Sequence, residues 1–261
     1  MDKAAYLLKK QLLQVQAQSF KREETCYSCY WIKENCRCHL IKPFSTDTRF
    51  IILMHPMEAK KEKLGTGRIC RATLLNSEII VGIDFTKNEQ VNALIANPEN
   101  SCRVLYPGEK SLNISSDDIS PLLATQKAGQ KSILFLIDGT WPCAKKMMTL
   151  SLNIRRLPRL SFTGTRESIF NIKEQPAAYC LSTLESIHHF LDESHRRGLE
   201  RLPTRPHDNL ILVFQSMIDF MLMCALDPNR SSYRPQPRGY SLRENRKKRK
   251  KSEMRSIILK D

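Results

Sequence analysis

The sequence has few aromatic residues and no long apolar run, and it lacks the marks of a secreted or membrane-spanning chain. Aromatic residues make up 7% of the 261 positions, which disfavours a binding module built on aromatic-rich strands. The most apolar segment, residues 210–226, is interrupted by Gln215 and Asp219 and is short for a membrane span. Residues 1–20 carry no continuous apolar core or cleavage site. We therefore expect a cytoplasmic protein that enters no membrane.

Acidic residues are also scarce relative to basic ones. The chain has 27 Asp and Glu against 42 Lys and Arg, which leaves a formal net charge of +15. Such an excess favours a polyanionic partner, with nucleic acid the first expectation and an anionic membrane surface the second. Part of the charge lies in residues 243–251, RENRKKRKK. This run is typical of a solvated, disordered tail, which can still act as an arm that grips nucleic acid.

The pattern of apolar residues divides the chain into four parts. Residues 1–22 predict an N-terminal helix, 23–42 a cysteine-rich segment, 43–227 an α/β domain, and 228–261 a basic tail that we expect to be disordered. In the α/β domain, predicted strands alternate with predicted helices, which favours a mostly parallel sheet with flanking helices. The strands are predicted at 49–54, 78–82, 102–106, 132–137 and 159–163, and the helices at 68–75, 88–96, 141–150, 177–195 and 208–226.

Four cysteines form a compact motif near the N-terminus. Cys26, Cys29, Cys36 and Cys38 give CxxC and CxC separated by six residues. Four thiolates suit tetrahedral zinc, and the first pair has the spacing of a zinc knuckle. Metal would also supply folding energy to a polar segment that has no hydrophobic core of its own. An iron–sulfur cluster, two disulfides and independent thiols remain the alternatives.

Polar residues follow two of the predicted strands at their carboxyl ends. Asp138 follows the apolar run 132–137 and begins the sequence Asp-Gly-Thr-Trp, and His55 follows the run 49–54. Open α/β sheets place their ligand sites at these strand ends. Taken alone, an Asp-Gly pair can be only a turn and Trp141 only a packing residue. A lone His is likewise more often structural than functional.

The order of several short motifs resembles the DTW-domain family of tRNA-uridine aminocarboxypropyltransferases. The motifs are CxxC-x6-CxC at 26–38, HPME at 55–58, TG at 66–67, LYPG at 105–108, DGTW at 138–141 and STLE at 182–185. The resemblance implies a SPOUT-like α/β fold, in which the chain can be knotted, and S-adenosylmethionine as the donor. The implied reaction moves the donor's 3-amino-3-carboxypropyl group to the imide nitrogen of a uridine in tRNA and releases methylthioadenosine.

The same resemblance implies the roles of individual residues. Asp138 is the candidate general base for the imide proton, although it could instead orient Thr140 or bind the donor's amino group. Glu185 could take the donor's ammonium or cap the helix that follows it. Trp141 could stack on a base or hold the sulfonium. The expected donor site comprises His55, Glu58, Thr66, Gly67, Leu105, Pro107, Gly108, Gly139, Thr140, Trp141, Thr183 and Glu185.

One departure from the family's pattern concerns RNA binding. Where the family tends to have an arginine-containing stretch before Gln-Pro, this sequence has FNIKEQP, in which only Lys173 is a cation. Arg155, Arg156, Arg159 and Arg166 are close in sequence, and we expect them to supply the missing charge. A methyltransferase that shares the donor, and a non-enzymatic zinc-knuckle RNA-binding protein, are the competing interpretations. A monomer and a homodimer both remain open.

Overall fold

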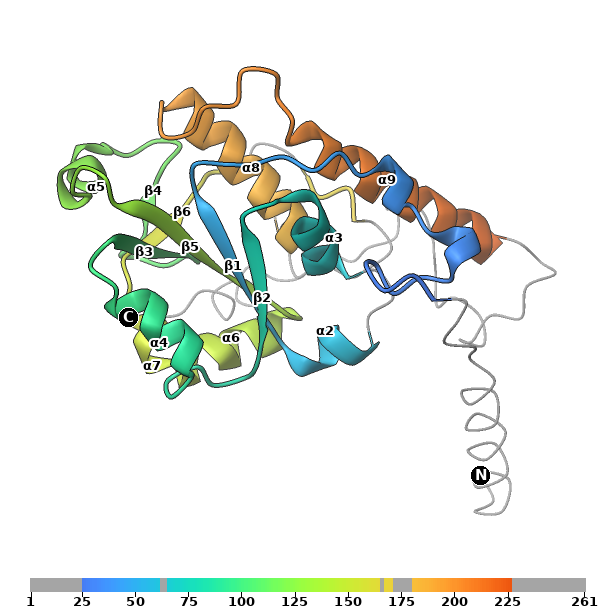
Figure 1. The fold of residues 1–261 in the computed structure, drawn as a ribbon, viewed down its shortest axis with the longest axis horizontal. Helices are drawn as coiled ribbons and strands as arrows, with labels where there is room; N and C mark the ends of the chain where they lie inside the picture. Colours follow the sequence, from blue (N-terminus) through green and yellow to red (C-terminus); the bar gives the residue numbers. More distant parts are fainter. Residues whose placement is uncertain (1–24, 62–64, 165–166, 171–179, 227–261) are drawn as a thin grey trace, which may run out of the picture.

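The computed structural model describes residues 25–61, 65–164, 167–170 and 180–226, and these residues build an α/β fold (Figure 1). The sheet has six parallel strands in the order β2-β1-β5-β3-β6-β4. The strands are β1 (Arg49–Met54), β2 (Ser77–Val81), β3 (Asn100–Leu105), β4 (Leu112–Asn113), β5 (Lys131–Asp138) and β6 (Arg159–Ser161). The predicted parallel α/β class is confirmed. The SPOUT-like topology and the knot stay predictions.

Helices cover both faces of this sheet. They are α2 (Pro56–Lys61), α3 (Thr66–Thr73), α4 (Glu89–Ala96), α5 (Ser120–Thr125), α6 (Trp141–Leu150), α7 (Leu152–Arg155), α8 (Thr183–Arg196) and α9 (Asp208–Leu226), with 3-10 turns η2 (Lys33–Asn35) and η3 (Cys38–Leu40) in the cysteine-rich segment. Within the described residues no helix is both long and apolar enough to span a bilayer. The predicted N-terminal helix and basic tail fall outside those residues.

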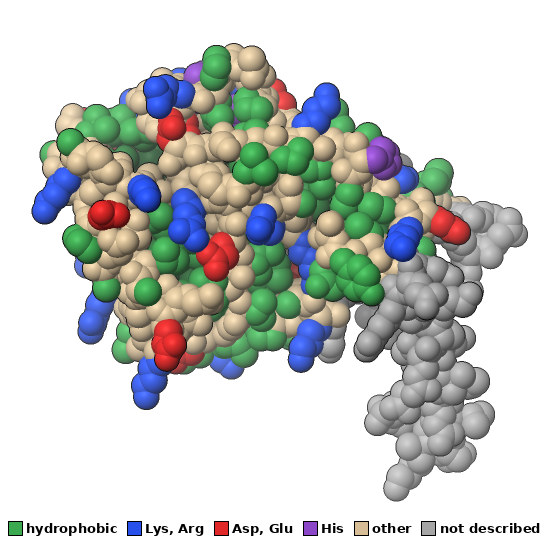
Figure 2. Space-filling view, viewed as in Figure 1, with side chains coloured by type: hydrophobic (Ala, Val, Ile, Leu, Met, Phe, Trp, Pro, Cys, Tyr) green, Lys and Arg blue, Asp and Glu red, His purple; other side chains and the backbone are tan. Residues whose placement is uncertain are grey.

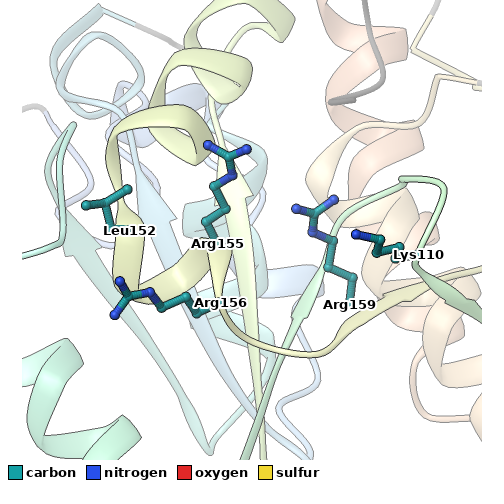
Figure 3. Close-up of a pocket in the computed structure, with 5 residues that line it drawn as sticks. All are labelled: Lys110, Leu152, Arg155, Arg156 and Arg159. Carbon is teal, nitrogen blue, oxygen red and sulfur yellow. The ribbon is translucent and has the colours of Figure 1, made fainter. Parts of the chain in front are cut away.

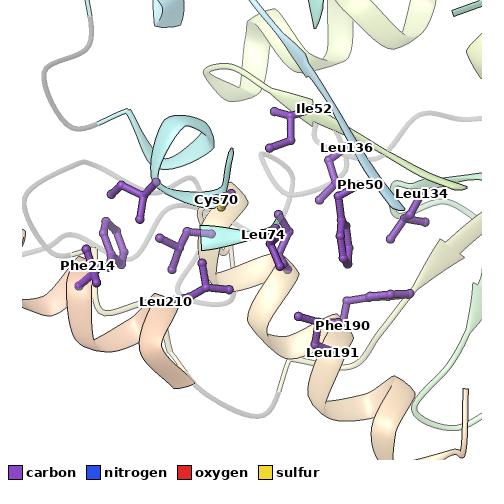
Figure 4. Close-up of a cluster of buried hydrophobic side chains, with 14 of the residues drawn as sticks. Phe50, Ile52, Cys70, Leu74, Leu134, Leu136, Phe190, Leu191, Leu210 and Phe214 are labelled. Carbon is purple, nitrogen blue, oxygen red and sulfur yellow. The ribbon is translucent and has the colours of Figure 1, made fainter. Parts of the chain in front are cut away.

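The central strands are apolar on both sides because each side meets a different layer of helices. Phe50, Leu134 and Leu136 pack in one cluster with Leu74, the C-cap of α3, and with α8 and α9 (Figure 4). The alternate residues pack in a second cluster with α4, α6 and α7, and they include Ile51, Leu53, Ile133 and Phe135. Burial on both faces explains why β1 and β5 have near-continuous apolar sequences rather than alternating ones.

Most predicted elements are found at or near their expected positions. The strand at 49–54 and the helix at 208–226 have the predicted bounds. The helix predicted from 177 was extended too far, because residues 180–182 are not helical and α8 begins only at Thr183. Ser182 caps that helix: its hydroxyl accepts from the Glu185 N–H while the Glu185 carboxylate accepts from the Ser182 N–H. This reciprocal capping box fixes the helix start.

The pair β1 and β5 forms the topological switch point of the sheet. The chain leaves β1 through α3 on one face to reach β2, and it leaves β5 through α6 and α7 on the other face to reach β6. Ligands bind in open α/β sheets at such a point, outside the carboxyl ends of the strands. Candidate ligand-binding residues therefore lie at these ends, and they are the sequence-predicted His55 after β1, Asp138 at the end of β5 and Gly139 after it.

Candidate active site

The ends of β1 and β5 lie directly against each other. Met54 pairs with Asp138 in the sheet, and the His55 N–H donates to the Asp138 carbonyl at 2.8 Å. A β-carbon on Gly139 would lie 3.3 Å from Cβ of His55, which is a tight contact. Absence of a side chain at Gly139 therefore allows the two predicted motifs, HPME and DGTW, to meet at one place.

Asp138 is held from two sides by residues far away in the sequence. Its side chain is only 4% exposed, and Oδ1 accepts a 2.6 Å hydrogen bond from the Thr183 hydroxyl at the start of α8. On the other side, a β-carbon on Gly67 would come within 2.5 Å of Oδ2. Burial, together with the Asp138 charge, raises the pKa of the Cys70 thiol, which lies one helical turn beyond Gly67. The carboxylate therefore lies in a close-fitting setting formed by β5, α3 and α8.

His55 has a structural role, as the sequence analysis left open for a lone histidine. Nδ1 of the buried ring accepts from the Met57 N–H at 3.2 Å, at the head of α2. When the ring is neutral, this contact leaves the proton on Nε2. Glu58 in α2 is also buried, as is Thr66 at the start of α3. These residues line the same edge of the sheet as Asp138, on the side of β1.

The residues after Gly139 begin α6 at the carboxyl end of β5. Thr140 is the N-cap of α6 but its side chain makes no capping hydrogen bond, and it is exposed. Trp141 is half-buried at the first position of the helix. The hydroxyl and the indole are thus available to a ligand that binds at this strand end.

The turn after β3 forms the next part of this edge. Tyr106 is buried, and burial raises its pKa to about 12 although nearby Arg159 acts in the opposite direction. A β-carbon on Gly108 would come within 2.8 Å of Nη1 of Arg159, so the turn and β6 are packed closely. Leu105 is half-buried and Pro107 is exposed. The predicted LYPG residues therefore lie one strand away from Asp138 and adjoin a basic region.

That basic region is a hollow of about 340 Å³ lined by cations (Figure 3). Arg155 and Arg156 come from the end of α7, Arg159 from the start of β6, and Lys110 from the loop after β3, with Leu152 as the apolar member. The sequence-predicted Arg155, Arg156 and Arg159 are therefore brought together with one more cation, Lys110. Arg166 and Lys173 are outside the described residues. Elsewhere, on the face in Figure 2, Lys and Arg are scattered among acidic residues.

The four predicted ligand cysteines converge in space. Their Sγ atoms all lie within 4.8 Å of one another, with Cys26–Cys38 at 3.8 Å and Cys29–Cys36 at 3.7 Å. Sulfurs that bind zinc at about 2.3 Å on the corners of a tetrahedron are about 3.8 Å apart, whereas a disulfide needs about 2.05 Å. The cluster thus fits a tetrahedral metal ion and contains no disulfide.

The electrostatics of the cluster agree with this geometry. Burial raises the pKa of Cys26, but backbone N–H groups of Cys29 and Ser28 outweigh burial and lower it to about 6. Burial raises the pKa of Cys29 to about 11. The Cys38 N–H points to Sγ of Cys36 at 3.3 Å. Such N–H donors stabilise thiolates around a metal, and a cation would overcome the cost of charging the buried members.

Comparison with known proteins assigns the chain to a family. The DTW domain family matches residues 23–222. This chain belongs to the DTW domain family.

Named relatives of this DTW-domain chain are about a quarter identical to it over the aligned residues. It is 28% identical over 179 residues to tRNA-uridine aminocarboxypropyltransferase 2 of Drosophila melanogaster, covering 67% of this chain and 68% of that protein. It is 26% identical over 170 residues to the proteins of that name from Macaca fascicularis and Mus musculus, covering 63% of this chain and 54% of each. The match thus spans about half the length of the two mammalian proteins. No solved structure matches the chain.

In this DTW domain the Glu185 carboxylate accepts its hydrogen bonds from groups of the protein itself. Its carboxylate accepts from the Ser168 hydroxyl and the Ser182 N–H through Oε2, and from the Ile169 N–H through Oε1. Of the two roles left open by the sequence, the structure displays the capping one. Glu185 also ties residues 168–169 to the start of α8, next to Thr183, which holds Asp138.

A second group of possible metal ligands in the DTW domain is already paired with an arginine. His188, Asp192 and His207 offer ligand atoms within 4.8 Å of one another. However, Nη1 of Arg205 lies 2.7 Å from Oδ1 of Asp192, and its Nε lies 2.9 Å from Oδ2 of Asp208. A guanidinium already neutralises these carboxylates, so the group ties α8 to the start of α9.

Sequence reasoning missed several residues that the fold brings to the site. Lys110 lies two residues after the LYPG turn, and this proximity was its only signal in the sequence. Arg68 is next to the TG motif and stacks on Tyr30 of the cysteine-rich segment, 4.1 Å from the ring centroid. Ser168 reaches Glu185 across 17 positions, a contact for which no local pattern exists.

Proposed function

We propose that this DTW-domain chain transfers the 3-amino-3-carboxypropyl group of S-adenosylmethionine to the imide nitrogen of a uridine in tRNA. The observation that carries the proposal is the buried Asp138 carboxylate, fixed by Thr183 and Gly67 at the switch point of a parallel sheet. The relatives' names support the same reaction and its substrate class. The basic hollow beside the LYPG turn supports a polyanionic substrate.

Asp138 acts as the general base in this proposal. The carboxylate accepts the proton of the uridine imide while the nitrogen attacks the γ-carbon of the donor's methionine chain. The carbon–sulfur bond breaks, its electron pair stays on sulfur, and neutral methylthioadenosine leaves. The sulfonium makes that carbon electrophilic. The Thr183 hydroxyl holds the carboxylate in one orientation, which reduces the cost of positioning in the transition state.

The residues at the strand ends fit a donor of this kind. Gly67 and Gly139 lie where a side chain would crowd Asp138 or His55, so their lack of a side chain lets α3 and the end of β5 pack closely around the carboxylate. Thr140 and Trp141 offer a hydroxyl and an aromatic face. We assign His55, Glu58, Thr66 and the turn 105–108 to the walls of the donor site, and Thr183 and Glu185 to positioning roles.

The cysteine cluster is proposed to hold structural zinc. Its sulfur–sulfur distances support tetrahedral coordination, and four protein ligands leave no open position for a reaction. Together with a tRNA substrate, thiolate ligands favour a cytoplasmic location. We keep the four-part division of the chain at 1–22, 23–42, 43–227 and 228–261 as part of the proposal, supported by the family match over residues 23–222.

Mass spectrometry of nucleosides from unmodified tRNA tests the reaction. Incubation with the protein and S-adenosylmethionine is expected to give aminocarboxypropyl-uridine and methylthioadenosine in equal amounts. Methylated nucleoside with S-adenosylhomocysteine would replace the proposal with methyl transfer. Tight tRNA binding without any product would favour a binding protein.

Asp138→Asn tests the proposed base, because the amide keeps the shape and can still accept from Thr183. We expect the rate to fall by about 10²–10⁴-fold and to recover partly at high pH, where the uridine imide ionises by itself. Asp84→Asn is the matched control, since Asp84 is exposed and its Oδ1 accepts from the Thr86 N–H. If Asp138→Asn instead raised only the KM for S-adenosylmethionine, Asp138 would be a donor-binding group.

A further inference from the structure

Tyr30 occupies a backbone conformation that costs energy for a residue with a side chain. It directly follows the second cysteine of the CxxC pair, and its φ is +62°. The loop is closed on both sides by 2.7 Å hydrogen bonds, from the Tyr30 N–H to the Cys26 carbonyl and from the Cys26 N–H to the Trp31 carbonyl. Glycine adopts this conformation without strain, whereas a bulky residue there is an outlier.

Burial does not compensate for this strain. The Tyr30 side chain is 53% exposed, so the ring gains little from the hydrophobic effect. The hydrogen-bonded loop accounts for the backbone conformation, but it does not account for tyrosine at a position where glycine would be free of strain. The role of the exposed aromatic ring therefore needs an explanation of its own.

Arg68 fixes one face of that ring. Its guanidinium carbon lies 4.1 Å from the ring centroid, and the same guanidinium donates to the carbonyl of Ala59 in α2. Stacking on a tethered guanidinium orders the ring and leaves its remaining surface to solvent. The result is a pre-oriented aromatic plane backed by a positive charge.

This plane is joined to the candidate active site by short contacts. Arg68 directly follows Gly67, which lies against Oδ2 of Asp138. Ala59 belongs to α2, the helix that starts immediately after His55. Helices α2 and α3 therefore connect Tyr30 to the strand ends at His55 and Asp138, so a strand of nucleic acid with one base at Asp138 can bring a neighbouring nucleotide to this ring.

We propose that Tyr30 stacks on an unpaired base next to the target uridine in the substrate RNA. Proteins recognise single-stranded RNA by stacking its bases on aromatic rings and arginine planes, and the net charge of +15 suits that partner. The inference rests on the proposed tRNA-modifying function and adds a residue that positions the RNA. It also explains why tyrosine stands where glycine fits the backbone.

Tyr30→Gly and Tyr30→Phe in the full-length, zinc-loaded chain test this proposal. The glycine variant relieves strain, so its thermal midpoint and zinc content are expected to equal or exceed those of the parent protein. Its Kd for tRNA, measured by fluorescence anisotropy without S-adenosylmethionine, is expected to rise about 5- to 150-fold, the loss of one base stack. Tyr30→Phe keeps the ring and is expected to stay within about 2-fold of the parent.

Each other outcome overturns a specific claim. If Tyr30→Gly lost stability or zinc, the tyrosine would be a structural residue of the cysteine cluster. If Tyr30→Gly kept the parent's tRNA affinity and KM while the parent modified tRNA, stacking would be wrong and the proposed reaction would stand. If the parent modified no tRNA, the proposed function would fail whatever Tyr30 does, and the anisotropy change would still report on stacking.

Discussion

Gly67 is the position where one added carbon tests the proposed site most directly. A β-carbon there would lie 2.5 Å from Oδ2 of Asp138 and 2.8 Å from Cε of Met54. Non-bonded heavy atoms prefer separations of about 3.5 Å or more, so Gly67→Ala requires a shift of about 1 Å. The Met54 methyl is the end of a flexible chain and can swing aside. Asp138 can move only by disturbing its hydrogen bond to Thr183.

Two opposing effects set the stability of Gly67→Ala. Replacing glycine by alanine in the first turn of α3 gains at most about 1 kcal/mol of helix propensity, whereas overpacking costs about 1–3 kcal/mol. The free energy of unfolding is therefore expected to fall by about 0–3 kcal/mol. A misplacement of about 1 Å in a reacting group costs about 100-fold in rate. Activity should consequently suffer far more than stability.

The assay pairs initial rates of aminocarboxypropyl-uridine formation with thermal unfolding. Gly65→Ala is the matched control at saturating tRNA, since the atoms nearest its new β-carbon belong to the flexible Arg68 side chain, at 3.1 Å or more, and not to Asp138. We expect Gly67→Ala to lose about 100-fold in rate and Gly65→Ala to stay near the parent. A folded Gly67→Ala protein with the parent's rate would refute the view that the position of Asp138 limits the reaction.

Three further predictions test other parts of the molecule. Removing the proposed metal from the cysteine cluster with a chelator should lower the thermal midpoint of unfolding, and added Zn²⁺ should restore it, because the ion supplies folding energy. An unchanged midpoint would show that the four cysteines are independent thiols. Reversing Arg155 and Arg156 to Glu should weaken tRNA binding and flatten the dependence of log Kd on log salt by about 2. The same reversal of Lys127 and Lys131, both exposed and at the amino end of β5, should flatten it less, and equal slopes would remove the basic hollow from the RNA surface. Tyr106→Phe should leave stability at neutral pH unchanged, since its buried hydroxyl has no hydrogen-bond partner among the described residues. Its folded pKa of about 12 lies above the usual 10.0, so the parent should lose stability as pH rises from 10 to 12 while Tyr106→Phe loses less, which alkaline unfolding curves measure.

The elements that the sequence predicts well are those with strong local signals. Strand β1 has five successive apolar residues, Phe50 to Met54, whose character reflects burial on both faces, and α9 begins at Asp208 with a mostly apolar stretch after it. Strand β4 has only Leu112 and Asn113, too short for any periodicity to mark it. The sequence could have predicted the start of α8, because the Ser182-x-x-Glu185 spacing is a capping-box signature.

The candidate site was predictable in its members but not in their contacts. Asp138 and His55 could be placed at strand ends because the apolar runs before them are clear. The hydrogen bond from Thr183 to Asp138 joins residues 45 positions apart, and the approach of Gly67 depends on how α3 packs. Such contacts are set by the tertiary fold, so only the order of the motifs hinted that these residues meet.

The cysteine cluster and the carboxylate belong to one packed unit, although they are far apart in sequence. Trp31 and Arg37 of the cysteine-rich segment both contact the Phe220 ring of α9, with distances of 5.6 Å and 4.9 Å to its centroid. Helix α9 packs on α3 and on α8, and these two helices supply Gly67 and Thr183 to Asp138. Since packed interiors transmit small shifts rather than absorb them, losing the metal should misplace Asp138 as well as loosen the N-terminal segment.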